Sequence, residues 1–220
     1  MSIFRLKSLR TSSLLCLQNL CNTLTTEDLG GAEGVYNVWV DLGHQVFQSH
    51  PDNIVLEAST ALMRSALEHL RNSPDLFKQM TIDDLELMLC GVKDCDEPEI
   101  RANWLKMLGI LGCLLPENLV KLIIIFVIEE LSTESDAWAI SEALDSLMDM
   151  FSDNDWDPLV YELNLSQKAK ELEKILKNKM RQQKKELGER YPAVSTVRTN
   201  FGRFVKYLES QMKKYKPIAN

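Results

Sequence analysis

Apolar residues recur at helical spacing along almost the whole of this 220-residue sequence. Leucine and other large apolar residues return every three or four positions, which places them on one face of a helix. Valine, isoleucine and threonine nowhere alternate in the way that a half-buried strand requires. Prolines precede several amphipathic runs, at the first-turn position that a helix tolerates: Pro51, Pro74, Pro98, Pro116 and Pro158. The pattern predicts an all-α chain.

The predicted helices come in pairs that repeat. Leu17, Leu62, Leu108 and Leu147 occupy equivalent core positions in the first helix of each pair, at spacings of 45, 46 and 39 residues. Such spacings are near the roughly 40–47 residues of HEAT and armadillo repeats. Stacked pairs bury an interior that no single pair could bury alone. We therefore expect a HEAT/armadillo-type α-solenoid of about four helix pairs.

The pairs have defined expected bounds. The first helices are expected at 10–24, 53–70, 97–109 and 136–151, and the second helices at 35–47, 82–92 and 117–131, with one more from Pro158. In the second helix of the first pair, Val35, Val38, Trp39, Leu42 and Val46 form an apolar stripe that we interpret as core. We expect the second helices to line the concave face of the stack.

The carboxyl-terminal part predicts a different unit. From Pro158 one helix of about 30 residues is expected up to Leu187, then a break between Gly188 and Pro192, and then a second amphipathic helix. A long hairpin with charged outer faces can close an apolar stack. We divide the chain into helix pairs at 1–157, capping helices at 158–216 and a tail at 217–220. Because no such cap precedes the first pair, the sequence resembles the carboxyl-terminal piece of a longer solenoid.

Charge is divided unevenly along the chain. The net charge is −7, but residues 165–216 hold 15 basic and 5 acidic residues, while the remainder holds 10 basic and 27 acidic ones. An acidic body of net charge −17 argues against nucleic-acid binding and for a basic partner, since a surface of one sign attracts ligands of the other. The longest apolar stretch, 119–128, is too short to cross a bilayer, so we expect no membrane span.

No catalytic or metal-binding apparatus is evident. The three histidines (His44, His50 and His69) lie in separate segments, with no metalloprotease motif and no nucleophile elbow. The glycines at 30–34 lack the Lys-Ser/Thr of a phosphate loop and indicate a turn. The acidic run that begins at Asp153 starts like a calcium loop, but Pro158 and Asn164 stand where the loop requires Gly and Glu. We expect a non-enzymatic protein with no metal and no cofactor.

Acidic residues at turns and on second helices are the candidate binding residues. If the second helices line one groove, several carboxylates would point into it and attract a cationic protein. Trp156 adds a possible aromatic contact. The candidate partner-binding residues are Asp83, Asp84, Glu86, Glu129, Glu130, Asp155, Trp156 and Glu162.

Two other functions remain open at this point. The chain could be a structural interaction module, or a fragment without cargo binding, whose exposed first repeat needs a partner. It could also be an organellar helical-repeat RNA-binding protein, because residues 1–26 contain Arg5, Lys7 and Arg10, eight Ser or Thr and no acidic residue, as mitochondrial presequences do. The acidic body weighs against the RNA-binding alternative, since phosphate contacts need cations.

Three segments resemble a known family. They read EIRANWLKMLGILG at 99–112, DAWAISEALDSLMDMF at 136–151 and RTNFGRFVKY at 198–207. They are similar to the carboxyl-terminal HEAT region of the symportin family, whose animal members are called HEAT repeat-containing protein 3. The likeness runs from about Ser8 to Lys216, and the AWAISEALD block and the ending are its distinctive parts.

The resemblance implies a non-enzymatic adaptor. The family escorts the basic large-subunit ribosomal proteins that travel with 5S ribosomal RNA into the nucleus, which implies roles in ribosome biogenesis and nuclear import and a location in cytoplasm and nucleus. Full-length members also carry an amino-terminal import signal, armadillo repeats and a long acidic insertion, none of which is seen in this sequence. Import-receptor binding and the capture of one of the two cargoes are therefore not expected of this chain.

Overall fold

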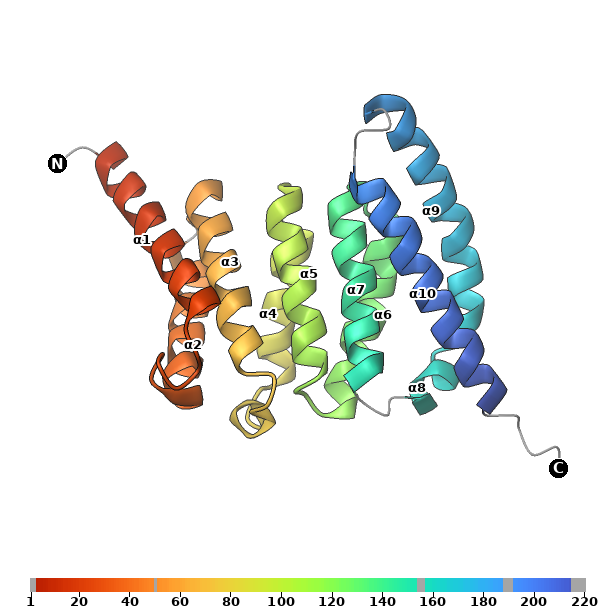
Figure 1. Cartoon of the computed structure of the whole chain (residues 1–220), viewed down its shortest axis with the longest axis horizontal. Coiled ribbons are helices and arrows are strands. Elements are labelled where there is room, and N and C mark those ends of the chain that lie inside the picture. The colour runs from red at the N-terminus through yellow and green to blue at the C-terminus, as the bar shows by residue number, and fades with distance from the viewer. Residues whose placement is uncertain (1–2, 50, 154–156, 188–191, 215–220) are drawn as a thin grey trace.

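The helices form two layers that run side by side along the molecule (Figure 1). The computed structural model describes residues 3–49, 51–153, 157–187 and 192–214. The first layer holds α1 (Ile3–Thr23), α3 (Asn53–His69), α5 (Pro98–Gly112), α7 (Ala137–Asp153) and α10 (Pro192–Lys214). The second layer holds α2 (Gly31–Ser49), α4 (Ile82–Lys93), α6 (Glu117–Thr133) and α9 (Leu165–Leu187). The described residues contain no strand, and the predicted all-α solenoid is confirmed.

Packing is closer in the first layer than in the second. Each first-layer helix packs against the next, from α1 through α3, α5 and α7 to α10. In the second layer α2 packs mainly on α3, whereas α4 packs mainly on α5 and makes little contact with α2. Helix α2 therefore contacts α3 most, whereas the sequence pattern predicts that it pairs with α1. As a result, consecutive helices are in contact along the whole first layer, whereas a gap separates α2 from α4 in the second layer.

The core is continuous along the stack, and most of the predicted positions lie in it. Leu62, Leu108 and Leu147 are completely buried, in the equivalent places that the repeat spacing predicts. The prediction for Leu17 is wrong, because this side chain is 48% exposed. Helix α1 contacts α3, and its most covered residues are Thr11, Leu14, Gln18 and Cys21, whereas residue 17 lies just outside this stripe. Val38, 46% exposed, is likewise outside the core stripe of α2.

The outward face of α1 is unusually apolar for a surface. Because α3 is the first-layer helix that covers α1, several leucines of α1 remain at the surface: Leu9, Leu15, Leu17 and Leu20 are 46–55% exposed, and Leu24, just after the helix, is 38% exposed. No helix within the described residues is long and apolar enough to span a membrane.

The single long helix predicted from Pro158 to Leu187 is wrong. The chain forms a short helix, α8 (Asp157–Glu162), and then turns before α9 begins. Asn164 makes the turn with a φ of 50°, a left-handed conformation that Asn tolerates better than most residues. Its carbonyl accepts hydrogen bonds from the N–H groups of Gln167 and Lys168, which starts α9. The break lets α9 pack on α6 and on α10. Pro74, another expected helix start, begins only the short 3₁₀ helix η1 (Pro74–Phe77).

The closest helix contact joins α5 and α7 at Gly109. A Cβ atom at residue 109 would lie 2.6 Å from both Cα and Cβ of Ser146, closer than real Cβ contacts. The Ser146 hydroxyl donates to the carbonyl of Leu105, at 2.6 Å, across the same contact. Glycine is therefore required here by proximity, not by backbone conformation.

We predict that Gly109→Ala destabilises the fold by about 2 kcal/mol, because the added methyl group meets helix backbone and forces α5 and α7 apart. Gly202→Ala in α10 is the matched control, since nothing lies within 4 Å of a Cβ at that position. The control is expected to gain about 0.5–1 kcal/mol from its higher helix propensity. Urea denaturation followed by circular dichroism measures both, and equal stabilities of the two variants would contradict the prediction.

Candidate protein-binding surface

The acidic residues predicted for α4 lie in its first two turns, on the second layer. Asp83 and Glu86 are exposed, with no ion pair in the described part of the chain. Asp84 accepts hydrogen bonds from the backbone N–H and the hydroxyl of Thr81, at 2.9 and 2.7 Å, and thus forms a capping box. These hydrogen bonds lower the pKa of Asp84, and His44 across the gap lowers it slightly further. The start of α4 therefore presents three neighbouring carboxyl groups.

The other predicted acidic residues lie elsewhere. Glu129 and Glu130 lie at the carboxyl-terminal end of α6, near Lys93 of α4. Burial raises the pKa of Glu130 despite the positive charge of Lys93. Glu162 of α8 pairs with Lys121 of α6. Asp155 and Trp156 lie outside the described residues. The structure therefore places the described predicted residues at the start of α4, at the end of α6 and on α8, instead of gathering them in one groove.

Some acidic residues hold the fold together instead of facing a partner. Glu134, 8% exposed, receives two hydrogen bonds from the Arg101 guanidinium, at 2.6 and 3.0 Å. The backbone N–H groups of Ser135 and Asp136 also donate to it, at 2.7 and 2.8 Å. Burial alone would raise the pKa of Glu134, but the hydrogen bonds from Arg101 and the two amides outweigh it and lower the pKa. This carboxylate ties α5 to the turn between α6 and α7.

A second internal network crosses the first layer. Lys106 of α5, with 15% of its side chain exposed, lies 2.9 Å from Asp145 and 2.8 Å from Asp149 of α7. Arg71, just after α3, also reaches Asp149 at 3.1 Å, and Arg203 of α10 lies 4.0 Å from Asp145. Burial opposes ionisation of Asp149, yet Lys106 and Arg71 together lower its pKa. These pairs hold Asp145 and Asp149 of the first layer in contacts between helices.

Glu142 of α7 differs from these paired acids. It is half-buried, and burial raises its pKa even though Lys106 and Arg64 lie near enough to oppose the effect. A raised folded-state pKa means that the ionised side chain costs stability at neutral pH. Glu134 has the opposite effect on stability. Its pKa is lowered, so its ionised side chain stabilises the fold at pH values above the ordinary glutamate pKa of 4.5.

We predict opposite effects of two Glu→Gln changes at about pH 7. Glu134→Gln should destabilise the chain by about 3 kcal/mol, because it leaves Arg101 without its buried counter-charge. Glu142→Gln should stabilise it, because the amide carries no charge to desolvate. Thermal unfolding between about pH 7 and pH 3 checks both: the Glu142 difference should shrink as pH falls towards 4.5, whereas the Glu134 difference should persist to about pH 4 and shrink only below it, because the pKa of Glu134 is lowered. Shifts of the same sign at pH 7 would contradict the prediction.

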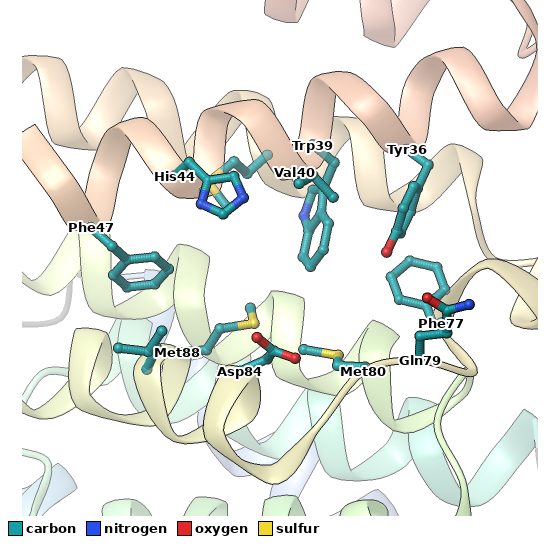
Figure 2. Close-up of a pocket in the computed structure, with 13 residues that line it drawn as sticks. Tyr36, Trp39, Val40, His44, Phe47, Phe77, Gln79, Met80, Asp84 and Met88 are labelled. Carbon is teal, nitrogen blue, oxygen red and sulfur yellow. The ribbon is translucent and has the colours of Figure 1, made fainter.

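A pocket between α2 and α4 is the feature that sequence reasoning missed (Figure 2). Its volume is about 320 Å³, and its walls are mostly aromatic and methionine side chains: Tyr36, Trp39, Phe47, Phe77, Met80 and Met88. The rings of Tyr36 and Trp39 each meet that of Phe77 edge to face, with centroids 5.3 and 5.6 Å apart. His44, Gln79 and Asp84 supply polar groups. The stripe of α2 was interpreted as core, and no sequence signal showed that α4 would stand away from it.

Trp39 is the unusual member of this pocket. It is 8% exposed, and its indole Nε1 is the one buried side-chain N or O without a hydrogen-bond partner among the residues that the structure describes. Burial of an unsatisfied N–H typically costs about 1–3 kcal/mol. Edge-to-face packing on Phe77 and the surrounding core holds the ring in place despite that cost.

Residues with catalytic side-chain types have structural roles. His69 Nε2 lies 2.6 Å from the carbonyl of Cys21, and its Nδ1 lies 3.1 Å from the hydroxyl of Thr26, so this histidine joins α3 to the end of α1. Gly30 and Gly31, with φ values of 96° and 80°, lead the chain into α2, which begins at Gly31. In the described ranges, no three His, Cys, Asp or Glu side chains come together as a metal site.

Comparison with known proteins gives one consistent picture. A family profile described as SYO1-like, TPR repeats, matches residues 2–212. The chain is 26% identical over 224 residues to HEAT repeat-containing protein 3 of Homo sapiens, and 27% identical over 228 residues to that of Mus musculus. Each alignment covers 96% of this chain and 33% of the relative, so the chain spans about a third of the length of these relatives. No solved structure matches significantly.

Proposed function

This chain belongs to the SYO1-like family of helical-repeat adaptors, and we propose on that premise that it is a non-enzymatic adaptor for basic proteins. The proposed partners are the basic large-subunit ribosomal proteins that accompany 5S RNA, as the family resemblance implies. On this proposal the chain acts in ribosome biogenesis and nuclear import, in both cytoplasm and nucleus.

The observation that carries the proposal is the charge of the repeats. Outside residues 165–216 the chain holds 27 acidic residues against 10 basic ones. The ion pairs of Asp145, Asp149 and Glu134 use part of this charge inside the fold. Asp83 and Glu86 on α4 remain exposed and lie on the layer that is not closed by packing. A surface of this kind attracts cationic proteins over a distance and speeds their association.

The start of α4 is the proposed contact surface, for two reasons. Asp83 and Glu86 make no ion pair in the described part of the chain, so they can pair with a cationic side chain without breaking an internal contact. Asp83 and Glu86 also lie beside Asp84, which lines the pocket between α2 and α4, so charge and apolar surface adjoin there. Glu129 and Glu130 are a second, smaller group at the far end of α6.

We predict that Asp83→Lys combined with Glu86→Lys weakens binding of a purified 5S-associated large-subunit ribosomal protein at least about tenfold, because charge attraction becomes repulsion. Binding of the unchanged chain should also weaken as salt rises from about 50 to 300 mM, since salt screens exposed charges. Fluorescence anisotropy with the labelled ribosomal protein measures both effects.

The matched control is Glu171→Lys combined with Glu209→Lys, which changes the net charge equally but lies on α9 and α10. It should change affinity less than about threefold if the contact surface is local. Equal loss in both double variants would show that net charge alone decides binding. Absent binding at low salt would refute the adaptor proposal for this chain.

A further inference from the structure

The pocket between α2 and α4 has the character of a ligand site rather than of a packing defect. Its volume of about 320 Å³ falls within the roughly 300–1,000 Å³ typical of binding pockets, which combine apolar walls with a few placed polar groups. Met63, Met80 and Met88 line it together with the aromatic side chains, and methionine adapts its shape to different occupants. The gap exists because α2 and α4 pack on different first-layer helices.

The indole N–H of Trp39 specifies what an occupant must offer. This N–H has no acceptor within the described residues although its side chain is only 8% exposed. Indole nitrogen is a donor and never an acceptor, so the complementary group is an oxygen such as a backbone carbonyl. In Figure 2 the Trp39 ring projects from α2 into the space above Met80 and Asp84.

The charge beside the pocket specifies a second feature of the occupant. Asp84 lines the pocket, and Asp83 and Glu86 are exposed on the same helix. A segment that crosses the pocket would therefore meet three carboxyl groups at one end. Lysine or arginine beside the buried side chain matches this arrangement.

We propose that the pocket between α2 and α4 binds one large apolar or aromatic side chain from an extended segment of a basic protein. A backbone carbonyl of that segment accepts the hydrogen bond of Trp39 Nε1–H, and an adjoining Lys or Arg faces Asp84. The class of partner rests on the proposed function, whereas the anchor and its orientation rest on the pocket itself.

Two synthetic peptides of equal charge test this inference: GSKRFLKKSG and GSKRSSKKSG. The chain has four tryptophans, and the Trp39 indole signal in a ¹H–¹⁵N spectrum can be assigned with Trp39→Phe. The apolar peptide should move the Trp39 indole proton downfield, as a new hydrogen bond does, and should leave the exposed Trp138 signal unchanged. The serine peptide should bind at least about tenfold more weakly. Equal shifts from both peptides, or none at Trp39, would overturn the proposal.

A filled pocket provides a second, independent test. Gly43 lines the pocket, and a Cβ there meets only Met63 Cε, at 3.6 Å, an ordinary contact distance. The Cβ of Gly43→Leu therefore meets no backbone, the rest of the side chain should occupy part of the pocket, and the higher helix propensity of leucine favours the folded state. Gly202→Leu in α10 is the matched control. The apolar peptide should lose at least about tenfold in affinity for Gly43→Leu and keep its affinity for Gly202→Leu; unchanged affinity for both would overturn the proposal.

The outcomes separate this inference from the adaptor function. If the ribosomal protein binds Gly43→Leu as tightly as the unchanged chain, charge-based binding stands and the pocket is not its anchor. If the apolar peptide binds at Trp39 but no ribosomal protein binds, the pocket stands and the proposed partner is wrong. A Trp39 shift that grows with the concentration of the chain itself, without peptide, would assign the pocket to a second copy and overturn the proposal.

Discussion

The close approach of α5 to α7 at Gly109 sets the spacing on which the rest of the molecule depends. With no side chain at residue 109, the backbone of α7 lies against α5, and the hydroxyl of Ser146 joins the two helices. The same first layer continues to α3 on one side and to α10 on the other. The gap between α2 and α4, and therefore the pocket, arises because α2 packs on α3 whereas α4 packs on α5.

The acidic residues of the repeats have two kinds of environment. In the first layer Lys106 and Arg71 neutralise the carboxylates of α7 across helix boundaries. Ion pairs of this kind are costly to break, because removal of one partner leaves a partly buried charge alone. Asp83 and Glu86 in the second layer make no ion pair within the described residues and are exposed to water. The acidic residues of the repeats thus form two groups: one pairs with cationic side chains and holds helices together, and the other is exposed to solvent.

The sequence predicts the fold well where a local pattern determines it. Leu62 and Leu147 are buried as their spacing requires, because each lies in a helix with neighbours on both sides. Leu17 has the same sequence context but is exposed, since burial depends on a neighbouring helix that periodicity does not reveal. Asn164 ends a pattern that reads as one helix, because its left-handed φ is a property of the turn and not of apolar spacing. The repeat period itself, 39–46 residues, is longer than the 34 of a TPR unit, although the family description uses that name.

The binding surface was harder to predict than the fold, for a physical reason. Acidic residues can be counted in the sequence, but whether Glu134 faces solvent or Arg101 is decided by a contact between residues 33 positions apart. The pocket has the same origin, since Trp39 and Phe77 are adjacent in space and distant in the chain.

The exposed carboxylates of α4 and the apolar pocket beside them would affect different steps of binding. Exposed carboxylates act at long range and raise the association rate, but they distinguish poorly between cationic proteins. A desolvated apolar contact with one oriented hydrogen bond acts only after encounter and lengthens the lifetime of the complex. An adaptor must both capture a cationic protein and hold it in one register. Asp84 and Trp39 line the same pocket, so on the proposed function one short segment of a partner would make both kinds of interaction.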